Sequence, residues 1–483
     1  MQNVCRLFFL SVVLNFAGKT AHSQLIEKAS PSPVTVIAPP ADSLNASIVV
    51  SDIIITGFKK TKPYIIQREI PFKKGENVSR SDLPSKLSLC KQQLMNTALF
   101  VDADVKAVAL DSNHIFIDIH VKERWYLFPV PYFRVVSRNF NTWWVEEKHN
   151  LNRAEYGLKF MQNNVSGRND DLNLWLISGF TQQFSLRYNN PNIDNKLKHG
   201  INIGFGIKRN RELNYGMDSI RPNKISFVKQ DNRFIINQNY IDFAYTYRPA
   251  IRTRHTFRAS YVNTGIDNLV LKLNPRYFAS PDTRLRYIGL SYNLSYTNLD
   301  YIPYPLKGFG GSANIYKRIG RNADFWQISG TGNYNAKFAP RSFLQLQAAG
   351  LIRFPFNQPY ISNNLMGSSD LYLRGLEYYV VEGVAGGVAR ATVKNEILSF
   401  NLNNPVNSKT YDKIPFRVFI KGYGDLGYSY TPNYGISRLN NKMLHTWGVG
   451  IDVTTFYDIA VRLEYSFNQL GDKGLFIHTQ TDF

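Results

Sequence analysis

The sequence predicts a membrane protein of the β class, a sixteen-stranded transmembrane β-barrel preceded by one small α+β domain. The prediction rests on an export signal at the start, amphipathic strand-length segments over the last two-thirds, and a terminal phenylalanine. The clearest segment spans 343–354, where Leu344 and Ile352 lie on one face and Gln345 and Arg353 on the other. Alternation of an apolar face with a polar face is typical of a barrel wall that has lipid outside and water inside.

Residues 1–23 have the features of a secretory signal peptide. Arg6 supplies a positive charge, 7–14 form a short apolar core, and 21–23 give a small-x-small cleavage site. The alternative interpretation is a buried N-terminal strand. Residues 24–46 are rich in proline, serine and alanine, so we expect an extended linker there.

Composition argues against several other classes of protein. Hydrophobic residues make up 44% of the chain and the mean hydropathy is −0.27. Beyond the first stretch, no apolar run reaches the roughly 18 residues that a transmembrane helix needs. The net charge is +21, but the basic residues are dispersed, which favours barrel rims near anionic lipid over a nucleic-acid partner. If the signal is removed, Cys90 is the only cysteine left, so no intramolecular disulfide is expected.

Residues 47–124 predict a compact domain with the order strand, helix, helix, strand, strand. The run from Thr97 to Phe100, followed by apolar residues at the alternate positions Val101, Ala103 and Val105, resembles the POTRA domain. This resemblance covers one copy and implies a periplasmic module that handles substrates or partners in outer-membrane assembly factors. The expected strands and helices span 48–56, 62–70, 81–97, 101–110 and 114–122.

Residues 125–483 are expected to form the barrel. Aromatic residues crowd the segment from Trp125 to Trp144, which indicates either the membrane–water interface or a packed seam between the two domains. Sixteen strand-length segments follow, an even number, as bacterial barrels require, whereas a soluble β-sandwich would need neither so many strands nor an export signal. The expected strands are 154–163, 169–179, 181–189, 199–208, 222–230, 233–247, 251–263, 284–297, 309–319, 324–338, 341–353, 384–399, 415–430, 443–453, 456–468 and 473–483.

One connection, 355–384, is too long for a hairpin and carries Arg374. Loops of this length in barrels are usually functional or fill the lumen. On the downstream strand, alternation places Ile420 toward lipid and Asp425 toward the lumen, and on the strand after the loop it places Glu396 toward the lumen. Both carboxylates are natural partners for an arginine that the loop brings inward, because a guanidinium binds a carboxylate through two parallel hydrogen bonds.

These residues resemble the BamA/TamA/TpsB superfamily of outer-membrane assembly and secretion barrels. In that family an Arg-Gly loop tip folds into the lumen and pairs with an acidic strand residue. The resemblance assigns the tip to Arg374 and Gly375, the strand aspartate to Asp425, and a further acidic residue to Glu396. The sequence departs from the family pattern at two positions. Leu373 stands where the family has Val or Ile, and Leu376 stands where it has an aromatic residue.

The function that the resemblance implies is insertion or assembly of other outer-membrane proteins in a Gram-negative bacterium, with the POTRA-like domain in the periplasm. The mechanism needs no chemistry, since strands add to exposed edges by main-chain hydrogen bonds. We expect a lateral seam between the first and last strands, near Tyr156, Phe476 and Phe483. The expected partners are unfolded outer-membrane proteins or one exported protein, together with periplasmic chaperones, lipoproteins and outer-membrane lipid.

Other functions remain as alternatives. A two-partner secretion pore is the first, although such relatives typically carry two POTRA units and a plug helix. An outer-membrane lipid hydrolase is a remote second, because no nucleophile elbow is found, and the run 308–312 lacks its spacing. A passive porin would not need the periplasmic module. We find no His-Glu-x-x-His motif, no cysteine pair and no phosphate loop, so we expect no enzyme activity, no metal and no cofactor.

Overall fold

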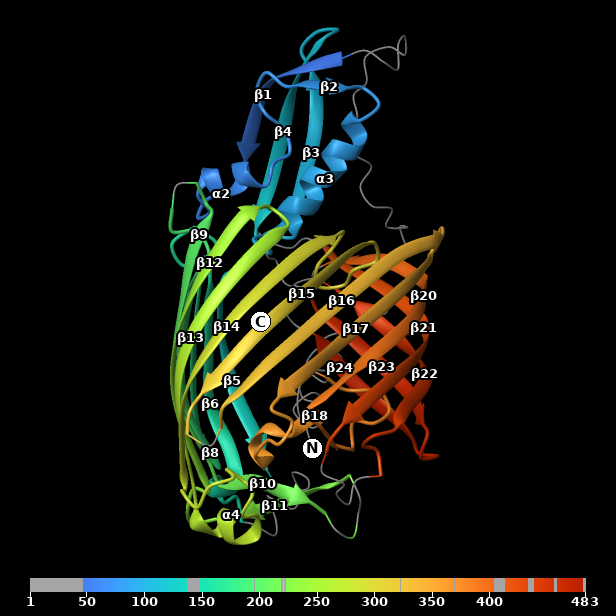
Figure 1. Cartoon of the computed structure of the whole chain (residues 1–483). Coiled ribbons are helices and arrows are strands. Elements are labelled where there is room, and N and C mark those ends of the chain that lie inside the picture. Colours follow the sequence, from blue (N-terminus) through green and yellow to red (C-terminus); the bar gives the residue numbers. More distant parts are fainter. Residues whose placement is uncertain are drawn as a thin grey trace.

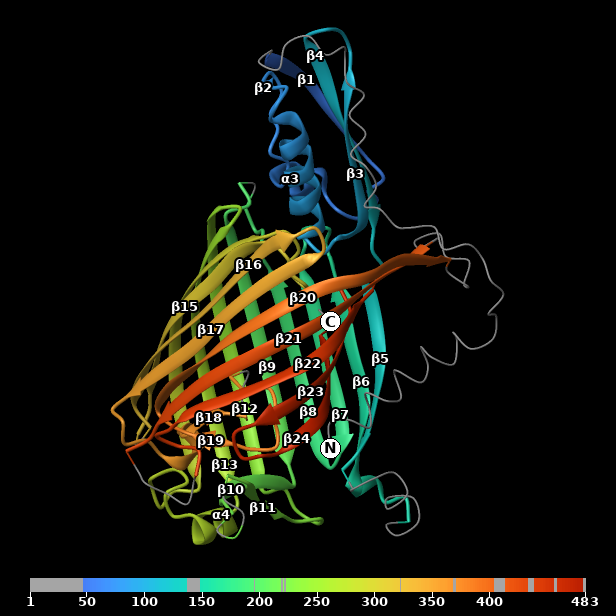
Figure 2. The same ribbon diagram turned by 90° about the vertical axis from the view of Figure 1, so that its right-hand side faces the viewer.

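Two bodies make up the described part of the chain, a small α+β domain and a β-barrel on whose rim it sits (Figures 1 and 2). The expected signal peptide, the linker and Phe483 lie outside the described residues. The computed structural model describes residues 47–136, 148–194, 196–218, 220, 223–321, 323–367, 371–403, 413–432, 438–455 and 458–480.

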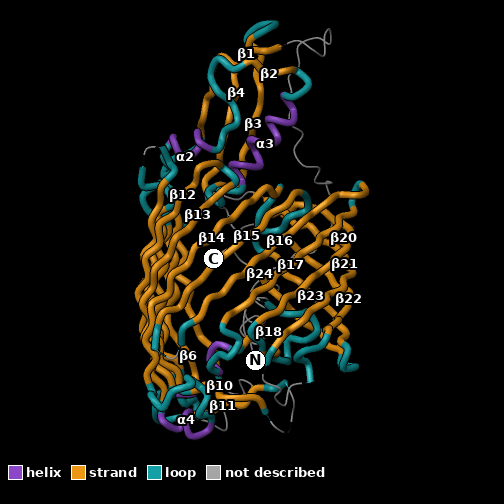
Figure 3. Tube along the Cα trace, in the orientation of Figure 1, coloured by secondary structure: helices purple, strands orange, loops and turns teal. Residues whose placement is uncertain are grey.

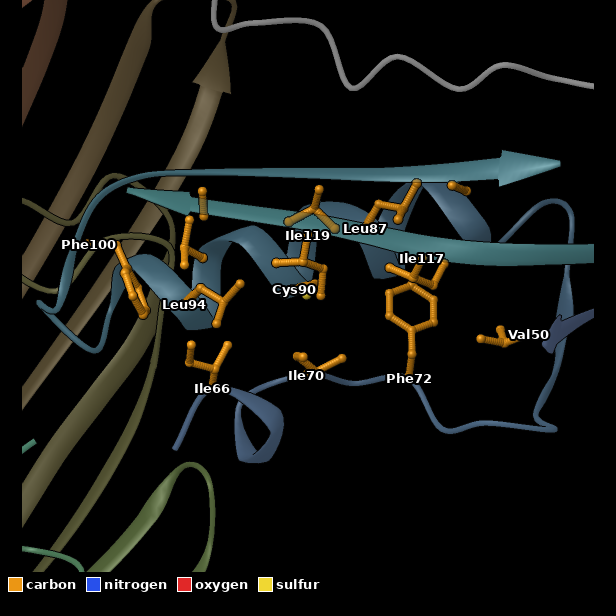
Figure 4. Close-up of a cluster of buried hydrophobic side chains, with 14 of the residues drawn as sticks. Val50, Ile66, Ile70, Phe72, Leu87, Cys90, Leu94, Phe100, Ile117 and Ile119 are labelled. Carbon is orange, nitrogen blue, oxygen red and sulfur yellow. The ribbon is translucent and has the colours of Figure 1, made fainter. Parts of the chain in front are cut away.

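The small domain has a four-stranded sheet in the order β2-β1-β4-β3, with β1 parallel to β4 and the other neighbours antiparallel. Apolar residues at helical spacing on α3, Leu87, Cys90 and Leu94, are fully buried against Ile117 and Ile119 of β4 (Figure 4). The sheet edges are β2 and β3. The elements are β1 (Ser47–Thr56), α2 (Pro63–Arg68), β2 (Asn77–Ser79), α3 (Leu83–Met95), β3 (Phe100–Ala109) and β4 (His114–Glu123).

The barrel is one sixteen-stranded antiparallel sheet that begins with β5 and ends with β24 (Figure 3). This confirms the predicted fold class. Every neighbour in the sheet is also the next barrel strand in the sequence, so the topology is a simple up-and-down meander. The strands are β5 (Leu127–Val135), β6 (Ala154–Asn163), β7 (Asp171–Gly179), β8 (Thr181–Asn190), β9 (His199–Asn210), β12 (Ile236–Ala250), β13 (Thr253–Ile266), β14 (Arg284–Leu299), β15 (Gly308–Ile319), β16 (Phe325–Ala339), β17 (Ser342–Phe354), β20 (Ala385–Asn403), β21 (Lys413–Tyr430), β22 (Met443–Thr454), β23 (Ala460–Asn468) and β24 (Lys473–Gln480).

The strand assignment needs two corrections. The first barrel strand is β5, whereas the sequence predicted that this aromatic segment precedes the first strand of the sheet. The expected strand 222–230 lies outside the barrel, because β11 (Ile225–Lys229) pairs with β10 (Glu212–Met217). This hairpin sits beside α4 (Asn268–Leu273), at the end of the barrel away from the small domain (Figure 1). Pro129 and Pro131 of β5 are tolerated because this strand lies at the end of the sheet.

Side chains of the barrel wall alternate as the sequence predicts. On β21, Ile420 and Leu426 are exposed on the outer face, whereas Phe419, Lys421 and Asp425 are buried inside. The outer face is therefore apolar and the inner face carries the charges. No helix in the described ranges is long and apolar enough to cross a membrane.

The long connection after β17 folds into the barrel. It contains η3 (Tyr360–Ser362) and a small hairpin of β18 (Asn364–Met366) and β19 (Val381–Glu382). Its leucines at 365, 373 and 376 are buried and pack, with Val388 of β20, in one apolar cluster. The lumen is therefore occupied at this level.

The small domain is fixed to the rim by polar contacts. Glu69 forms an ion pair with Arg248 at the end of β12, with Nη1 and Oε1 2.9 Å apart. The Asn96 side chain donates to the carbonyl of Leu299 over 3.0 Å. The backbone N–H of Lys62 donates to the carbonyl of Gly167, in the β6–β7 turn, over 2.9 Å. These contacts hold the domain at the end of the barrel opposite α4.

Candidate functional site

The central contact of the lumen joins the long loop to β21. The Arg374 backbone N–H and side-chain Nε both donate to Asp425 Oδ2, over 3.1 Å and 2.9 Å, and Nη2 donates to Oδ1 over 2.5 Å. Both side chains are almost fully buried. This fork-to-carboxylate geometry fixes the direction as well as the position of the guanidinium.

Three further groups surround the Arg374 guanidinium. Thr392 Oγ1 on β20 accepts from Nη2 over 3.1 Å. The Tyr423 ring lies 3.9 Å below the guanidinium carbon, a cation–π distance. Glu464 on β23 lies 3.7 Å from Nη1. The arginine is thus paired or packed on several sides, as a buried charge requires.

Local sequence explains why the tip adopts this shape. Gly375 has φ +89°, a conformation that other residues rarely adopt, and a Cβ there would lie 2.9 Å from Ser466 Cβ. Leu373 fills the space above Gly427, where an added Cβ would lie 2.7 Å from Leu373 Cδ1. Leucine at 373, a departure from the family pattern, therefore packs against a glycine on the facing strand.

The same loop also contacts the last two strands of the barrel. Asn468 Nδ2 at the end of β23 donates to the Gly375 carbonyl over 2.8 Å. The ring of Tyr378 lies 5.3 Å from that of Phe476 on β24. The ring of Tyr372 stacks 5.9 Å from that of His478 on the same strand. The loop therefore bridges from β20 and β21 to the terminal strand.

Glu396 lies elsewhere. It accepts a hydrogen bond from Arg417 over 2.5 Å, next to a register shift in β20. Thr392, which does contact Arg374, lies four residues earlier, so Glu396 sits about 13 Å further along the strand. The expectation that Glu396 joins the Arg374 site is corrected: the second carboxylate near Arg374 is Glu464.

A second buried polar cluster continues from Glu464 toward the rim. Lys421 Nζ lies 2.6 Å from Glu464 and 2.5 Å from Asp452. Asp452 in turn accepts from the hydroxyl of Tyr304 over 2.7 Å. Tyr304 belongs to the β14–β15 turn, which folds inward on the side of the small domain, and its ring packs at a tilt against that of Phe419, with the ring centroids 5.1 Å apart.

The residues expected at the seam fall in three places. Tyr156 is on β6, the second strand, where it pairs with Phe133 of β5 and Ser178 of β7. It is therefore not at the end of the sheet, because the true first strand was missed. Phe476 is on the terminal strand β24, with its side chain turned inward and buried. Phe483 lies outside the described residues.

Thr392, Tyr423 and Glu464 were not predicted from the sequence as neighbours of Arg374. The signal for Glu464 was available, since it shares a face with Ser466 while Leu463 and Tyr465 point outward. No cluster of three His, Cys, Asp or Glu side chains suited to a metal occurs among the described residues. The arrangement can hold the loop 355–384 against β20 and β21 on one side and against β23 and β24 on the other, which is a structural role.

Comparison with known proteins identifies the small domain. The model of the POTRA family, described as a surface antigen variable number repeat, matches residues 48–124. These residues form a POTRA domain. No curated protein matches the sequence.

Three solved structures are similar to this chain over 89–90% of its length. The crystal structure of BamA from Haemophilus ducreyi lacking POTRA domains 1–3 matches with 13% identity and TM-score 0.47, over 90% of this chain and 84% of that one. CdiB from Escherichia coli matches with 10% identity and TM-score 0.50, over 89% of this chain and 75% of that one. CdiB from Acinetobacter baumannii matches with 11% identity and TM-score 0.48, over 90% of this chain and 73% of that one.

The likeness to Escherichia coli CdiB shows a shared fold. The expected superfamily architecture, a POTRA domain followed by a sixteen-stranded barrel, is therefore confirmed at the level of the fold. A sixteen-stranded meander with an apolar outer face and a preceding POTRA domain is an outer-membrane barrel of a Gram-negative bacterium, and its POTRA domain lies on the periplasmic side. The rim that carries the POTRA domain is accordingly the periplasmic rim.

Proposed function

We propose that this protein inserts or assembles other outer-membrane proteins without catalysing a chemical reaction. An unfolded outer-membrane chain first meets the POTRA domain, whose sheet has a ten-residue strand, β3, at one edge. It then adds strands at the lateral seam between β5 and β24. Main-chain hydrogen bonding drives both steps, so the client needs amphipathic strands rather than a fixed sequence.

The occupied lumen is the observation that carries this proposal. The loop 355–384 is held inside the barrel by the ion pair of Arg374 with Asp425 and by its buried leucines. From the periplasmic side, the turn with Tyr304 also folds inward. A chain that passes through the lumen would have to displace both segments, whereas a chain that adds at the seam would leave them in place.

The ends of the sheet support a lateral route. The strand order runs from β24 to β5, and no register joins these two strands among the described residues. The loop contacts β24 through Phe476 and His478, so it can steady the inner face of the terminal strand. Periplasmic chaperones and lipoproteins are further partners that we assign to the POTRA domain, and outer-membrane lipid surrounds the seam.

Depletion of the protein in its own bacterium tests the proposal. Quantitative proteomics of the outer membrane should show a broad fall in β-barrel proteins, with unfolded barrels accumulating in the periplasm. A strain that carries the wild-type gene under separate control serves as the reference. Loss of one exported protein with all other barrels unchanged would contradict assembly and establish the secretion pore instead.

A further inference from the structure

The outer face of the barrel carries three arginines at the end away from the POTRA domain. On β9, Arg209 shares a face with the exposed Phe205, because every second residue of a strand lies on the same side. On β14, Arg284 and Arg286 share a face with the exposed Ile288 in the same way. The pairing of these strands with their neighbours has no register break at these positions. All three arginines are exposed and lie on the lipid side of the wall.

The register of the sheet brings these arginines into one patch. Arg209 pairs with Asn237 of β12, Asn237 pairs with Gly265 of β13, and Gly265 pairs with Arg284 of β14. Neighbouring strands are about 4.8 Å apart, so about 14 Å of wall separates Arg209 from Arg284. A Cβ added at Gly265 would meet no atom closer than 3.9 Å. The surface between the arginines is therefore open.

The positive charge of the patch is not balanced by carboxylates. On the five strands β8, β9, β12, β13 and β14, Asp242 is the only acidic residue, and it faces the lumen, where it pairs with Arg187 and Arg258. None of the three outward arginines forms an ion pair with a residue that the structure describes. The other polar side chains of the patch are uncharged amides: Gln182, Asn237, Asn239 and Asn263. The patch thus offers hydrogen-bond donors and positive charge to an anion.

The depth of the patch follows from the apolar residues of β14. The outward positions from Ile288 to Tyr296 are all apolar or aromatic and span about 27 Å along the strand. At the usual strand tilt this is roughly 20 Å along the membrane normal, close to the apolar band of an outer-membrane barrel. Arg286 and Arg284 are the next two outward positions, at the extracellular end. They therefore lie at the level of the head groups of the outer leaflet.

An apolar groove adjoins the patch on the same outer face. It runs over β6 to β9, has a volume of about 590 Å³, and is lined by Leu158, Leu176, Phe184 and Ile207, with Arg209 also in its lining. This volume lies in the range of pockets that hold a small ligand. Ile207 is two residues closer to the middle of the membrane than Arg209. The groove therefore leads from a charged group at head-group level into the apolar band.

We propose that this face binds a phosphorylated glycolipid of the outer leaflet, with two phosphates on a sugar head group and several acyl chains. One phosphate binds Arg209, the other binds Arg284 and Arg286, and the sugar lies over Gly265. A guanidinium binds a phosphate through two parallel hydrogen bonds, which makes arginine well suited to this task. One acyl chain lies in the groove. The inference does not depend on the function proposed above, because an assembly factor and a secretion pore would present the same face to the lipid.

Native mass spectrometry of the full-length protein in detergent micelles tests the site. The probe is lipid A with two phosphates and six acyl chains. Wild-type protein should retain one molecule, and the triple variant Arg209→Gln, Arg284→Gln and Arg286→Gln should bind on the order of tenfold more weakly. Lys473→Gln is the matched control for Arg209→Gln alone, because it also removes an exposed basic side chain from the outer face at the extracellular end. Wild-type binding by the triple variant, or an equal loss in the two single variants, would overturn the proposal.

Three further measurements identify the ligand. Lipid A without its phosphates should bind weakly, and neither inorganic phosphate nor phosphatidylglycerol should displace intact lipid A at equal concentration. Gly265→Phe keeps all three arginines but fills the space between them, so it should also weaken lipid A binding. The heat-dependent shift on electrophoresis checks that each variant is folded. Displacement by inorganic phosphate or by phosphatidylglycerol would show that any anion or any anionic lipid suffices, and unchanged binding in Gly265→Phe would contradict the position of the sugar. Each of these results would overturn the assignment.

Discussion

Arg374 occupies a position where an unpaired guanidinium would be strongly unfavourable. It is 7% exposed, and its partner Asp425 is 1% exposed. When one member of such a pair is removed, the other charge remains buried without compensation. The Tyr423 ring and Thr392 hold the planar guanidinium in one orientation. A lysine cannot reproduce that arrangement, because its ammonium is a point charge on a flexible stem.

The first prediction concerns this pair. Arg374→Ala should impair assembly while the barrel still folds, through loss of an interaction worth about 1–3 kcal/mol. Arg374→Lys should restore activity only in part. Asp425→Asn should copy the alanine defect, and the two changes together should cost little more than either alone, as coupled partners do. Activity is measured by complementation of the depleted strain, and folding by the heat-dependent shift of the barrel on electrophoresis.

Arg417→Ala is the matched control for Arg374→Ala. Arg417 also forms an ion pair, with Glu396, but its side chain is 40% exposed and it contacts Glu396 and the Phe419 ring, which both belong to barrel strands. Its removal should leave activity near that of the wild type. Wild-type activity in Arg374→Ala, or fully additive defects in the double variant, would show that the tip arginine has no role in the mechanism.

The second prediction concerns Cys90. Burial raises the pKa of its thiol from 9.0 to about 12, because the thiolate would lose its hydration in the POTRA core. A maleimide at pH 8 should therefore leave Cys90 unmodified in the folded protein and modify it in denaturant. The same shift means that stability of the POTRA domain is full below pH 9 and falls as the pH rises toward 12, since the unfolded thiol ionises first. Rapid labelling under native conditions would contradict this.

Alternation along the strand predicted that Asp425 faces the lumen, whereas the length of the connection 355–384 and the family resemblance singled out Arg374. The prediction that Glu396 lies beside Arg374 was wrong. Alternation shows which face of the strand a residue occupies, but it shows neither the position of the residue along the strand nor a shift in register. The sequence could not distinguish Thr392 and Tyr423, which contact Arg374, from the other polar residues that face the lumen. The reason is that only the folded barrel determines which strands the loop crosses.

Among the elements, β5 shows most clearly that the place of a strand in the sheet decides whether it tolerates proline. Two prolines in nine residues normally argue against a strand. The N–H of Asn163 donates to the Tyr126 carbonyl and that of Val136 to the Arg153 carbonyl, so even-numbered residues of β5 face β6 and the two proline nitrogens face the end of the sheet. The predicted total of sixteen strands was right only because this missed strand offset the β11 hairpin, which was assigned to the wall.

The third prediction concerns the loop tip as an element. Gly375→Ala should displace the tip and reduce assembly as much as Arg374→Ala does. The reason is that alanine at φ +89° is strained by about 1–2 kcal/mol, and its Cβ would lie 2.9 Å from Ser466 Cβ. Gly422→Ala is the control, because a Cβ at this β21 position meets nothing within 4 Å. Equal activity of the two variants would show that the tip conformation is unimportant.

At the scale of the whole molecule, the POTRA domain and the barrel form one unit on the periplasmic rim. Arg124, the last residue of the domain, pairs with Asp458 in the turn between β22 and β23, with Nη2 and Oδ1 3.1 Å apart. Asp458 also accepts from Tyr301 in the β14–β15 turn. The domain is thereby held beside both the inward turn and the last strands, which is where a client chain would leave it for the seam.

The fourth prediction is topological. Lys73 and Lys74 are exposed on the POTRA domain, so trypsin should cut there once the outer membrane is permeabilised. In intact cells the same site should be protected, because the domain faces the periplasm. Immunoblotting against the POTRA domain distinguishes the two cases. Cleavage at Lys73 or Lys74 in intact cells would reverse the orientation of the whole barrel.

The central claim is that clients enter through the seam between β5 and β24, and a reversible lock tests it most directly. A cysteine at Leu475 of β24 is combined in turn with one cysteine along β5, from Leu127 to Val135, and the pair that crosslinks is used. Buried Cys90 should not interfere. Assembly of newly made barrels should stop while the disulfide is present and resume after reduction. Full assembly with the seam locked would contradict lateral insertion and show that clients pass through the lumen.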